Sequence, residues 1–126
     1  MSVYRTIHLG TRITSAVISI IWAIIHLYLF TQLVGRLPIV GYFFLFDGIL
    51  AIVSSIILAI GIKSLYLPTL VYWYINYILL AESRIYPAPV LGRPLPVINM
   101  YVIAAFVLDA ILIILVTITW FASRRL

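Results

Sequence analysis

One stretch decides the fold class of this chain: Gly41 to Ile62, which reads GYFFLFDGILAIVSSIILAIGI. It contains a single charged residue, Asp47, among apolar side chains. A helix needs about 20 mostly apolar residues to cross the hydrocarbon core of a bilayer. The strands of a transmembrane barrel would instead show about 10 residues of alternating polarity, and this continuous run lacks that alternation. The stretch therefore predicts a membrane-spanning α-helix.

Three further runs of the same character occupy most of the remaining chain. Together they predict four spans and one longer, proline-rich loop: spans at about residues 11–33, 41–62, 65–82 and 98–121, and the loop at 83–97. The predicted fold is all-α, an integral membrane four-helix bundle with up-down-up-down topology and short loops. We expect residues 1–126 to form a single membrane domain, because little chain is left for a soluble one.

The composition indicates that lipid is the main solvent of this chain. The sequence is 66% hydrophobic and 9% charged, whereas a soluble domain carries about a quarter charged residues. The formal net charge is +5, but the basic residues are scattered at loop ends. We interpret them as topology and headgroup charges and expect no nucleic-acid partner. The absence of cysteine excludes disulfides and thiol catalysis within this chain.

The distribution of basic residues predicts the orientation. With four spans both termini lie on one face of the membrane, with Arg5, Arg12, Lys63, Arg124 and Arg125. The other face holds Arg36, Arg84 and Arg93. This bias predicts a multi-pass protein of the cell membrane with cytoplasmic termini. The proline-rich loop would face outward, either as a stiffened connector or as a surface for a partner subunit with Tyr86, Pro87 and Arg93.

A small set of polar residues lies deep in the apolar runs and forms the candidate site. His26, Asp47 and Asp109 are ionisable, and Asn76 is a strong hydrogen-bonding side chain. An ionisable residue inside a membrane helix is costly and indicates a functional site. From the helical rise, the first two and Asn76 lie roughly 10 Å below one interface and Asp109 roughly 16 Å. Small-residue stripes on the first two spans predict close packing, with His26 beside Asp47.

Three interpretations of this polar cluster stay open. It is a hydrogen-bonded core that fixes helix register, a path for protons, or a contact with the haem or quinone of another subunit, with His26 as the cofactor-binding residue. A bis-histidine haem within one chain is excluded, because His8 is eighteen residues from His26, roughly 27 Å along a helix. No metal-ligand spacing, nucleophile constellation or phosphate loop is present. We therefore expect no enzyme, no catalytic residue, no metal, and no cofactor bound by this chain alone.

Two motifs carry a resemblance to known proteins. The chain reads HLYL from His26 and LPIVGYFFLFD from Leu37 to Asp47. In these segments it resembles a loose group of small, uncharacterised prokaryotic four-helix membrane proteins. Its composition, rich in Ile and Tyr, also looks like that of small hydrophobic subunits of archaeal respiratory complexes, including terminal oxidases and cytochrome b complexes. A more distant similarity is to the DoxX-like four-helix family.

These observations lead to a ranked set of functional hypotheses. The first is a non-catalytic accessory subunit of a larger membrane complex, and the resemblance implies a respiratory one. The second is a small autonomous carrier or proton-conducting bundle that uses His26, Asp47 and Asp109. The third is a membrane protein associated with a quinone or a haem.

Overall fold

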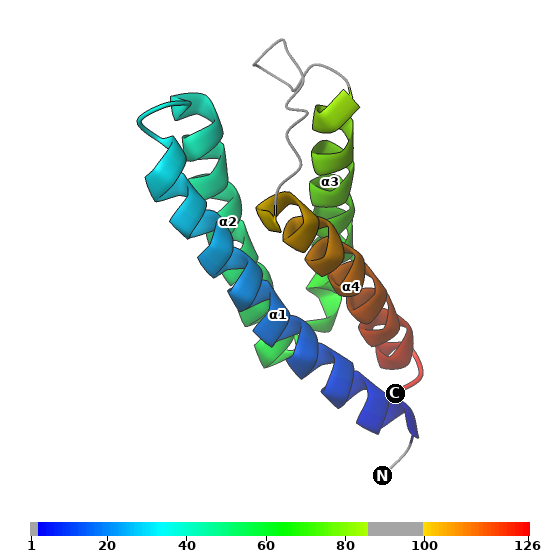
Figure 1. Ribbon diagram of the computed structural model, residues 1–126. Helices are drawn as coiled ribbons and strands as arrows, with labels where there is room; N and C mark the ends of the chain where they lie inside the picture. Colours follow the sequence, from blue (N-terminus) through cyan, green and yellow to red (C-terminus); the bar gives the residue numbers. More distant parts are fainter. Residues whose placement is uncertain (1–2, 86–99) are drawn as a thin grey trace.

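The computed structural model describes residues 3–85 and 100–126, and within them the chain is helical with no strand. Four α-helices and one short 3-10 turn follow in order: α1 Val3–Leu33, α2 Pro38–Ile60, η1 Lys63–Leu65, α3 Tyr66–Ile85 and α4 Met100–Ser123. The start of α1 and the end of α4 lie at the same end of the molecule (Figure 1). The all-α, four-helix prediction is therefore confirmed.

Three helices, α1, α2 and α4, are long and apolar enough to cross a membrane. Their apolar surfaces indicate a lipid environment. Lipid offers no hydrogen-bond partners, and a helix suits it because its backbone groups bond to one another. The helix α3 has 20 residues and is therefore about 30 Å long, which equals the thickness of the hydrocarbon core of a bilayer. Its four tyrosines and Asn76 make it the least apolar of the four.

Most helix ends differ from the predicted span ends by one to three residues, and the start of α1 differs by eight. The helix α1 begins at Val3, eight residues before the predicted start of the first span, and α3 continues to Ile85, past the predicted start of the loop. Hydropathy marks where lipid contact ends, but helical hydrogen bonding continues wherever the backbone allows it. Charged side chains such as Arg5 can extend into the interface without ending the helix.

The ends of α2 have clear local causes. Pro38 lies in its first turn, where the missing N–H is not needed. Gly61 ends the helix with φ of 84°, in the left-handed region that glycine adopts at little cost. The N–H groups of Gly61 and Ile62 donate to the carbonyl of Ile57 at 2.9 and 3.1 Å, which completes the capping motif. This tight stop turns the chain directly into η1 and α3.

The four helices pack with α1 at the centre of the arrangement. It packs most extensively against α2 and then against α4 (Figure 1). The backbone of α3 packs mainly against α4, and α3 reaches α2 through side chains. The buried residues of α1 and α4 follow steps of three and four, the spacing of helix-packing surfaces: Ser15, Ser19, Trp22 and His26 on α1, and Ala105, Asp109, Leu112, Val116 and Thr119 on α4. The largest fully buried apolar side chains are Trp22, Trp73, Tyr66, Leu58, Leu112 and Val116.

Small residues allow α1 and α2 to approach closely. A Cβ added at Gly48 would stand 2.9 Å from a Leu27 methyl group, and Ala23 and Ala51 are almost completely buried. Ser55 donates a hydrogen bond to the carbonyl of Ala16 at 2.8 Å. Close approach of this kind is how membrane helices gain van der Waals contact when lipid removes the hydrophobic driving force.

Candidate functional site

Asp47 on α2 is held by two side chains of α3. The hydroxyl of Tyr72 lies 2.7 Å from Asp47 Oδ1 and 2.8 Å from the Asp47 carbonyl oxygen. One terminal atom of the Asn76 amide lies 2.5 Å from Oδ2 and 3.1 Å from Oδ1, and the other lies 3.3 Å from the Tyr72 hydroxyl. Asp47 and Asn76 are buried, at 5% and 7% exposed. We call Asp47, Tyr72 and Asn76 the Asp47 triad.

Asp109 lies on α4 in a different setting. It is 1% exposed, and its Oδ1 has no hydrogen-bond partner in the described residues. The indole of Trp22 on α1 lies beside it, but Trp22 Nε1 does not reach hydrogen-bond geometry and is also without a partner, as is Ser19 Oγ. These three atoms are buried polar groups of the kind that water or an ion usually satisfies.

The register of α1 and α4 brings these groups together. The hydroxyls of Thr11 and Thr119 lie 2.7 Å apart, and the two helices run in opposite directions (Figure 1). Asp109 precedes Thr119 by ten residues, and ten residues after Thr11 is Ile21. Asp109 therefore lies level with the turn from Ser19 to Trp22. The Asp47 carboxylate is near enough to act electrostatically on Asp109, so the two acids share one buried region.

His26 makes its contacts with aromatic rings and a backbone carbonyl. Its ring stacks on Trp22 at 3.5 Å between centroids and meets Phe44 edge-on at 5.2 Å. Its Nδ1 donates to the Trp22 carbonyl at 2.9 Å. We expected His26 beside Asp47, but these two side chains make no hydrogen bond in the described residues. The imidazole is 7% exposed and is covered by aromatic rings, which favours a packing role for it.

Two tryptophans connect the parts of this region. Trp22 meets Trp73 edge-on at 5.1 Å between centroids, and Trp73 meets Tyr72 in the same manner at 4.8 Å. Trp73 Nε1 donates to Ser54 Oγ at 3.0 Å. The candidate site predicted from the sequence did not include Trp22. The spacing of four residues between Trp22 and His26, which puts both on one helix face, could have identified it.

The chemistry available to these groups is limited by charge. Neither Asp47 nor Asp109 has an ion-pair partner among the described residues, and those residues contain no group of three His, Cys, Asp or Glu side chains that could hold a metal ion. Burying an unpaired carboxylate costs several kcal/mol even after relaxation. The region therefore offers carboxyl oxygens without a basic partner, which makes it suitable for binding a proton or a small cation.

A second polar group lies at the end of the bundle that holds the termini. His8 Nε2 lies 2.9 Å from the Tyr66 hydroxyl, and Arg12 donates to the carbonyl of Ala59 at 3.3 Å. A guanidinium in this position gives an unpaired carbonyl its hydrogen bond. Its positive charge also interacts favourably with the negative end of the α2 dipole. At the same end Arg124 stacks over Trp120. The contacts of His8 and Arg12 join α1 to the start of α3 and the end of α2.

The remaining predicted residues are Tyr86, Pro87 and Arg93 of the partner-facing loop, and they lie outside the described residues. Of the four cluster residues, the structure joins Asp47 to Asn76, places Asp109 in the same buried region and turns His26 toward Trp22. Comparisons with protein families, with curated proteins and with solved structures find no match to this chain. Its function must therefore be inferred from its own residues.

Proposed function

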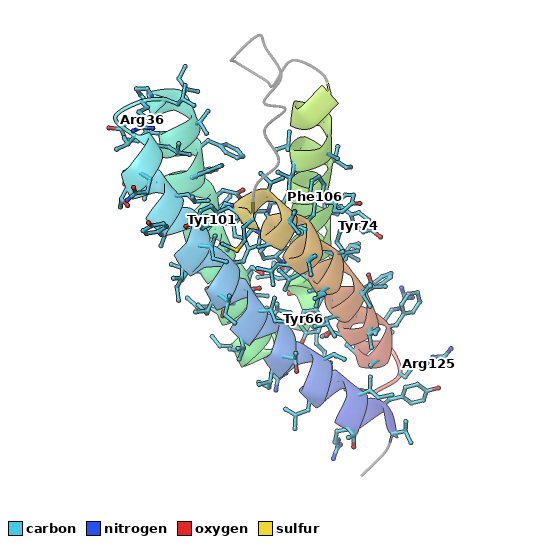
Figure 2. The ribbon with its side chains drawn as sticks, in the orientation of Figure 1. Arg36, Tyr66, Tyr74, Tyr101, Phe106 and Arg125 are labelled. Carbon is cyan, nitrogen blue, oxygen red and sulfur yellow. The ribbon has the colours of Figure 1, made fainter. Side chains whose placement is uncertain are left out.

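We propose that this protein is an accessory subunit of a larger membrane complex and that another subunit covers its helix α3. One observation carries the proposal. The helix least suited to lipid presents a tyrosine to the outside near the middle of its length. Tyr74 is 46% exposed and lies eight residues after the start of α3, about 12 Å along the helix. Figure 2 shows it on the outer side of the α3–α4 pair.

Lipid gives this tyrosine a poor environment. Tyrosines favour the membrane interfaces, where the hydroxyl meets water, and a hydroxyl among acyl chains has no hydrogen-bond partner. The outward positions at about the same depth on the other helices are aliphatic: Ile24, Val53 and Val107. Only α3 departs from this pattern among the described helices, so a protein surface is the better partner for it.

The exposed face of α3 also has the spacing of a helix-packing surface. Leu67, Val71, Tyr74 and Ile78 are each about half exposed and follow steps of four, three and four residues. This is the spacing with which one helix packs against another at a small crossing angle. A transmembrane helix of a partner subunit fits this stripe, with an acceptor for the Tyr74 hydroxyl.

The orientation is part of the same proposal. Lys63 and Arg125 lie at the end of the bundle with the termini, and Arg36 lies at the opposite end (Figure 2). The positive-inside bias then places the termini in the cytoplasm of a cell whose plasma membrane holds the protein. The resemblance to subunits of archaeal respiratory complexes makes an oxidase or a cytochrome b complex the first partner to test.

Photo-crosslinking in the native membrane tests the proposal. A benzophenone amino acid is placed at position 74, and a matched control carries it at position 24, which is outward but aliphatic. We expect an adduct with a different polypeptide from position 74 and none from position 24. Lipid adducts alone at both positions would contradict a partner subunit, as would an adduct of two copies of this 14.3 kDa chain.

A second function, a proton-conducting bundle, is favoured by Asp47 and Asp109, two buried carboxylates without a cationic partner in the described residues. Such residues mark proton paths in membrane proteins. Purified protein in liposomes should then pass protons down a pH gradient. Replacing both acids by asparagine should abolish this flux, and replacing the exposed Glu82 by glutamine should leave it unchanged. Flux that survives the double replacement would remove this function.

A further inference from the structure

We propose that the turn between α2 and α3 carries a binding site for one anionic phospholipid, in which Arg12 of α1 and Lys63 of η1 hold the phosphate. The acyl chains of that lipid lie along the apolar side chains beside the turn. The inference concerns lipid rather than a partner subunit, so it stands or fails independently of what covers α3.

The site lies at the level of the lipid headgroups. The 23 residues of α2 measure about 34 Å, slightly more than the hydrocarbon core of a bilayer at about 30 Å. Lys63 follows the last residue of α2 by three positions. Arg12 donates a hydrogen bond to the carbonyl of Ala59, in the last turn of α2. Both cations therefore lie where α2 leaves the hydrocarbon and the phosphate groups begin.

Arg12 and Lys63 lie close to one another. Both charges act electrostatically on His8, and Arg12 also acts on Tyr66. His8 Nε2 and the Tyr66 hydroxyl lie 2.9 Å apart and bond to each other, and neither an imidazole nor a phenol is negative near neutral pH. Two like charges around such a pair repel one another unless an anion lies between them.

No acidic side chain of the protein balances these two cations. The sequence has three acidic residues: Asp47 and Asp109 lie deep in the apolar helices, and Glu82 lies near the opposite end of α3. The Lys63 side chain is exposed and has no hydrogen-bond or ion-pair partner in the described residues. The counter-charge then comes from the surroundings, and at this level of a membrane the available anion is a lipid phosphate.

The Arg12 guanidinium is held in a fixed position for an anion. Its Nη1 donates to the Ala59 carbonyl at 3.3 Å and lies directly against Gly61, with no room for a Cβ between them. Its Nε is enclosed by protein. The second terminal nitrogen, Nη2, has no partner among the described residues and keeps its hydrogens for another acceptor. A guanidinium fixed in this way binds a phosphate oxygen with geometry as well as charge.

The surface beside the cations is apolar, which selects a lipid over a free phosphate ion. Ile60 at the end of α2 is 67% exposed, and Leu67 near the start of α3 is 48% exposed. They lie three residues before and four residues after Lys63. A phospholipid matches both parts of this surface, because its phosphate meets the cations and its acyl chains cover the apolar side chains.

A second pair of cations at the same end of the bundle provides a matched control. Arg124 lies over the Trp120 ring at 5.2 Å, and Arg125 lies over the Tyr4 ring at 5.9 Å. Figure 2 shows Arg125 at the end of α4, away from Tyr66. Replacing this pair removes as much charge from the same end as replacing Arg12 and Lys63, without altering the proposed site.

Native mass spectrometry of the intact protein measures the site directly. The purified protein in detergent is titrated with phosphatidylglycerol and with phosphatidylcholine of the same acyl chains, and the bound molecules are counted. Each basic residue near the surface strengthens the binding of an anionic lipid about fivefold, the equivalent of about 1 kcal/mol. For the first bound molecule we therefore expect a preference for phosphatidylglycerol of about 25-fold.

Lys63→Gln should lower this preference about fivefold, and adding Arg12→Gln should remove it. Arg124→Gln with Arg125→Gln should leave it unchanged. Because Lys63 is exposed, its single variant tests the site even if Arg12→Gln fails to fold. Equal losses in the two double variants would indicate a diffuse surface charge and overturn the site, as would the same affinity for both lipids. Displacement of phosphatidylglycerol by inorganic phosphate would overturn a lipid as the ligand.

Discussion

Gly41→Ala is the substitution for which this structure gives the sharpest prediction. Gly41 lies in the first turn of α2, against Val34 just after the end of α1. A Cβ at position 41 would stand 2.7 Å from the Cα of Val34 and 2.8 Å from its nitrogen. Both are backbone atoms, so no side-chain rotation relieves the contact. The α1–α2 hairpin would have to open at this turn.

The expected magnitude is the difference between two opposing effects. Alanine in place of glycine within a helix stabilises by about 0.5–1 kcal/mol. Overpacking that forces a backbone shift costs about 1–3 kcal/mol, and an opened hairpin also loosens the tight contact between Gly48 and Leu27. We therefore expect the free energy of unfolding to fall by about 1–2 kcal/mol.

Gly10→Ala is the matched control, because a Cβ at position 10 of α1 meets no atom within 4 Å. This variant should be stabilised by about 0.5–1 kcal/mol. Both free energies are measured by titrating SDS into mixed micelles and following the fluorescence of the buried Trp22 and Trp73. The two variants should move in opposite directions. A Gly41→Ala protein as stable as Gly10→Ala would refute the reasoning from close approach.

Three further predictions concern polar contacts and the end of α2, and the same titration measures each. Ser54→Ala should cost about 1–3 kcal/mol, because it leaves the buried N–H of Trp73 without an acceptor. The adjacent Ser55→Ala should cost only about 0.6 kcal/mol, because the carbonyl of Ala16 keeps its helical hydrogen bond. Equal losses of unfolding free energy in the two serine variants would contradict this difference. Gly61→Ala should cost at least about 1–2 kcal/mol for the left-handed backbone, because its Cβ must also displace the Arg12 guanidinium that donates to the carbonyl of Ala59. A variant as stable as the original protein would contradict both causes.

The sequence predicted the helices well because hydropathy adds over many residues. A run of about 20 apolar side chains leaves a membrane helix as the only stable outcome, whatever the individual residues are. The α3 helix is the weakest case. Its tyrosines and Asn76 lower its hydropathy, and its position beside α4 became clear only from packing. The extra turns at the start of α1 could not be predicted, because hydropathy does not report helical hydrogen bonding in the interface.

Among the polar residues, depth was predictable and pairing was not. Depth follows from counting residues along a helix of fixed rise, so Asp47 and Asn76 were expected at one level, and the structure brings them into contact. The direction of a side chain around the helix axis depends on how neighbouring helices are rotated. That rotation turns Asp47 toward Tyr72 of α3 and leaves His26 stacked on Trp22 of its own helix.

Hydropathy along the chain was enough to predict helices long and apolar enough to cross a membrane, with a few polar residues deep within them. Both conclusions follow from the high cost of exposing polar groups to lipid, which every residue experiences independently of its neighbours. The tertiary structure alone decided that Asp47, Tyr72 and Asn76 form one hydrogen-bonded unit and that Asp109 faces Trp22. Hydrogen bonds require atoms within about 3 Å, and only the packed arrangement of all four helices sets distances that short.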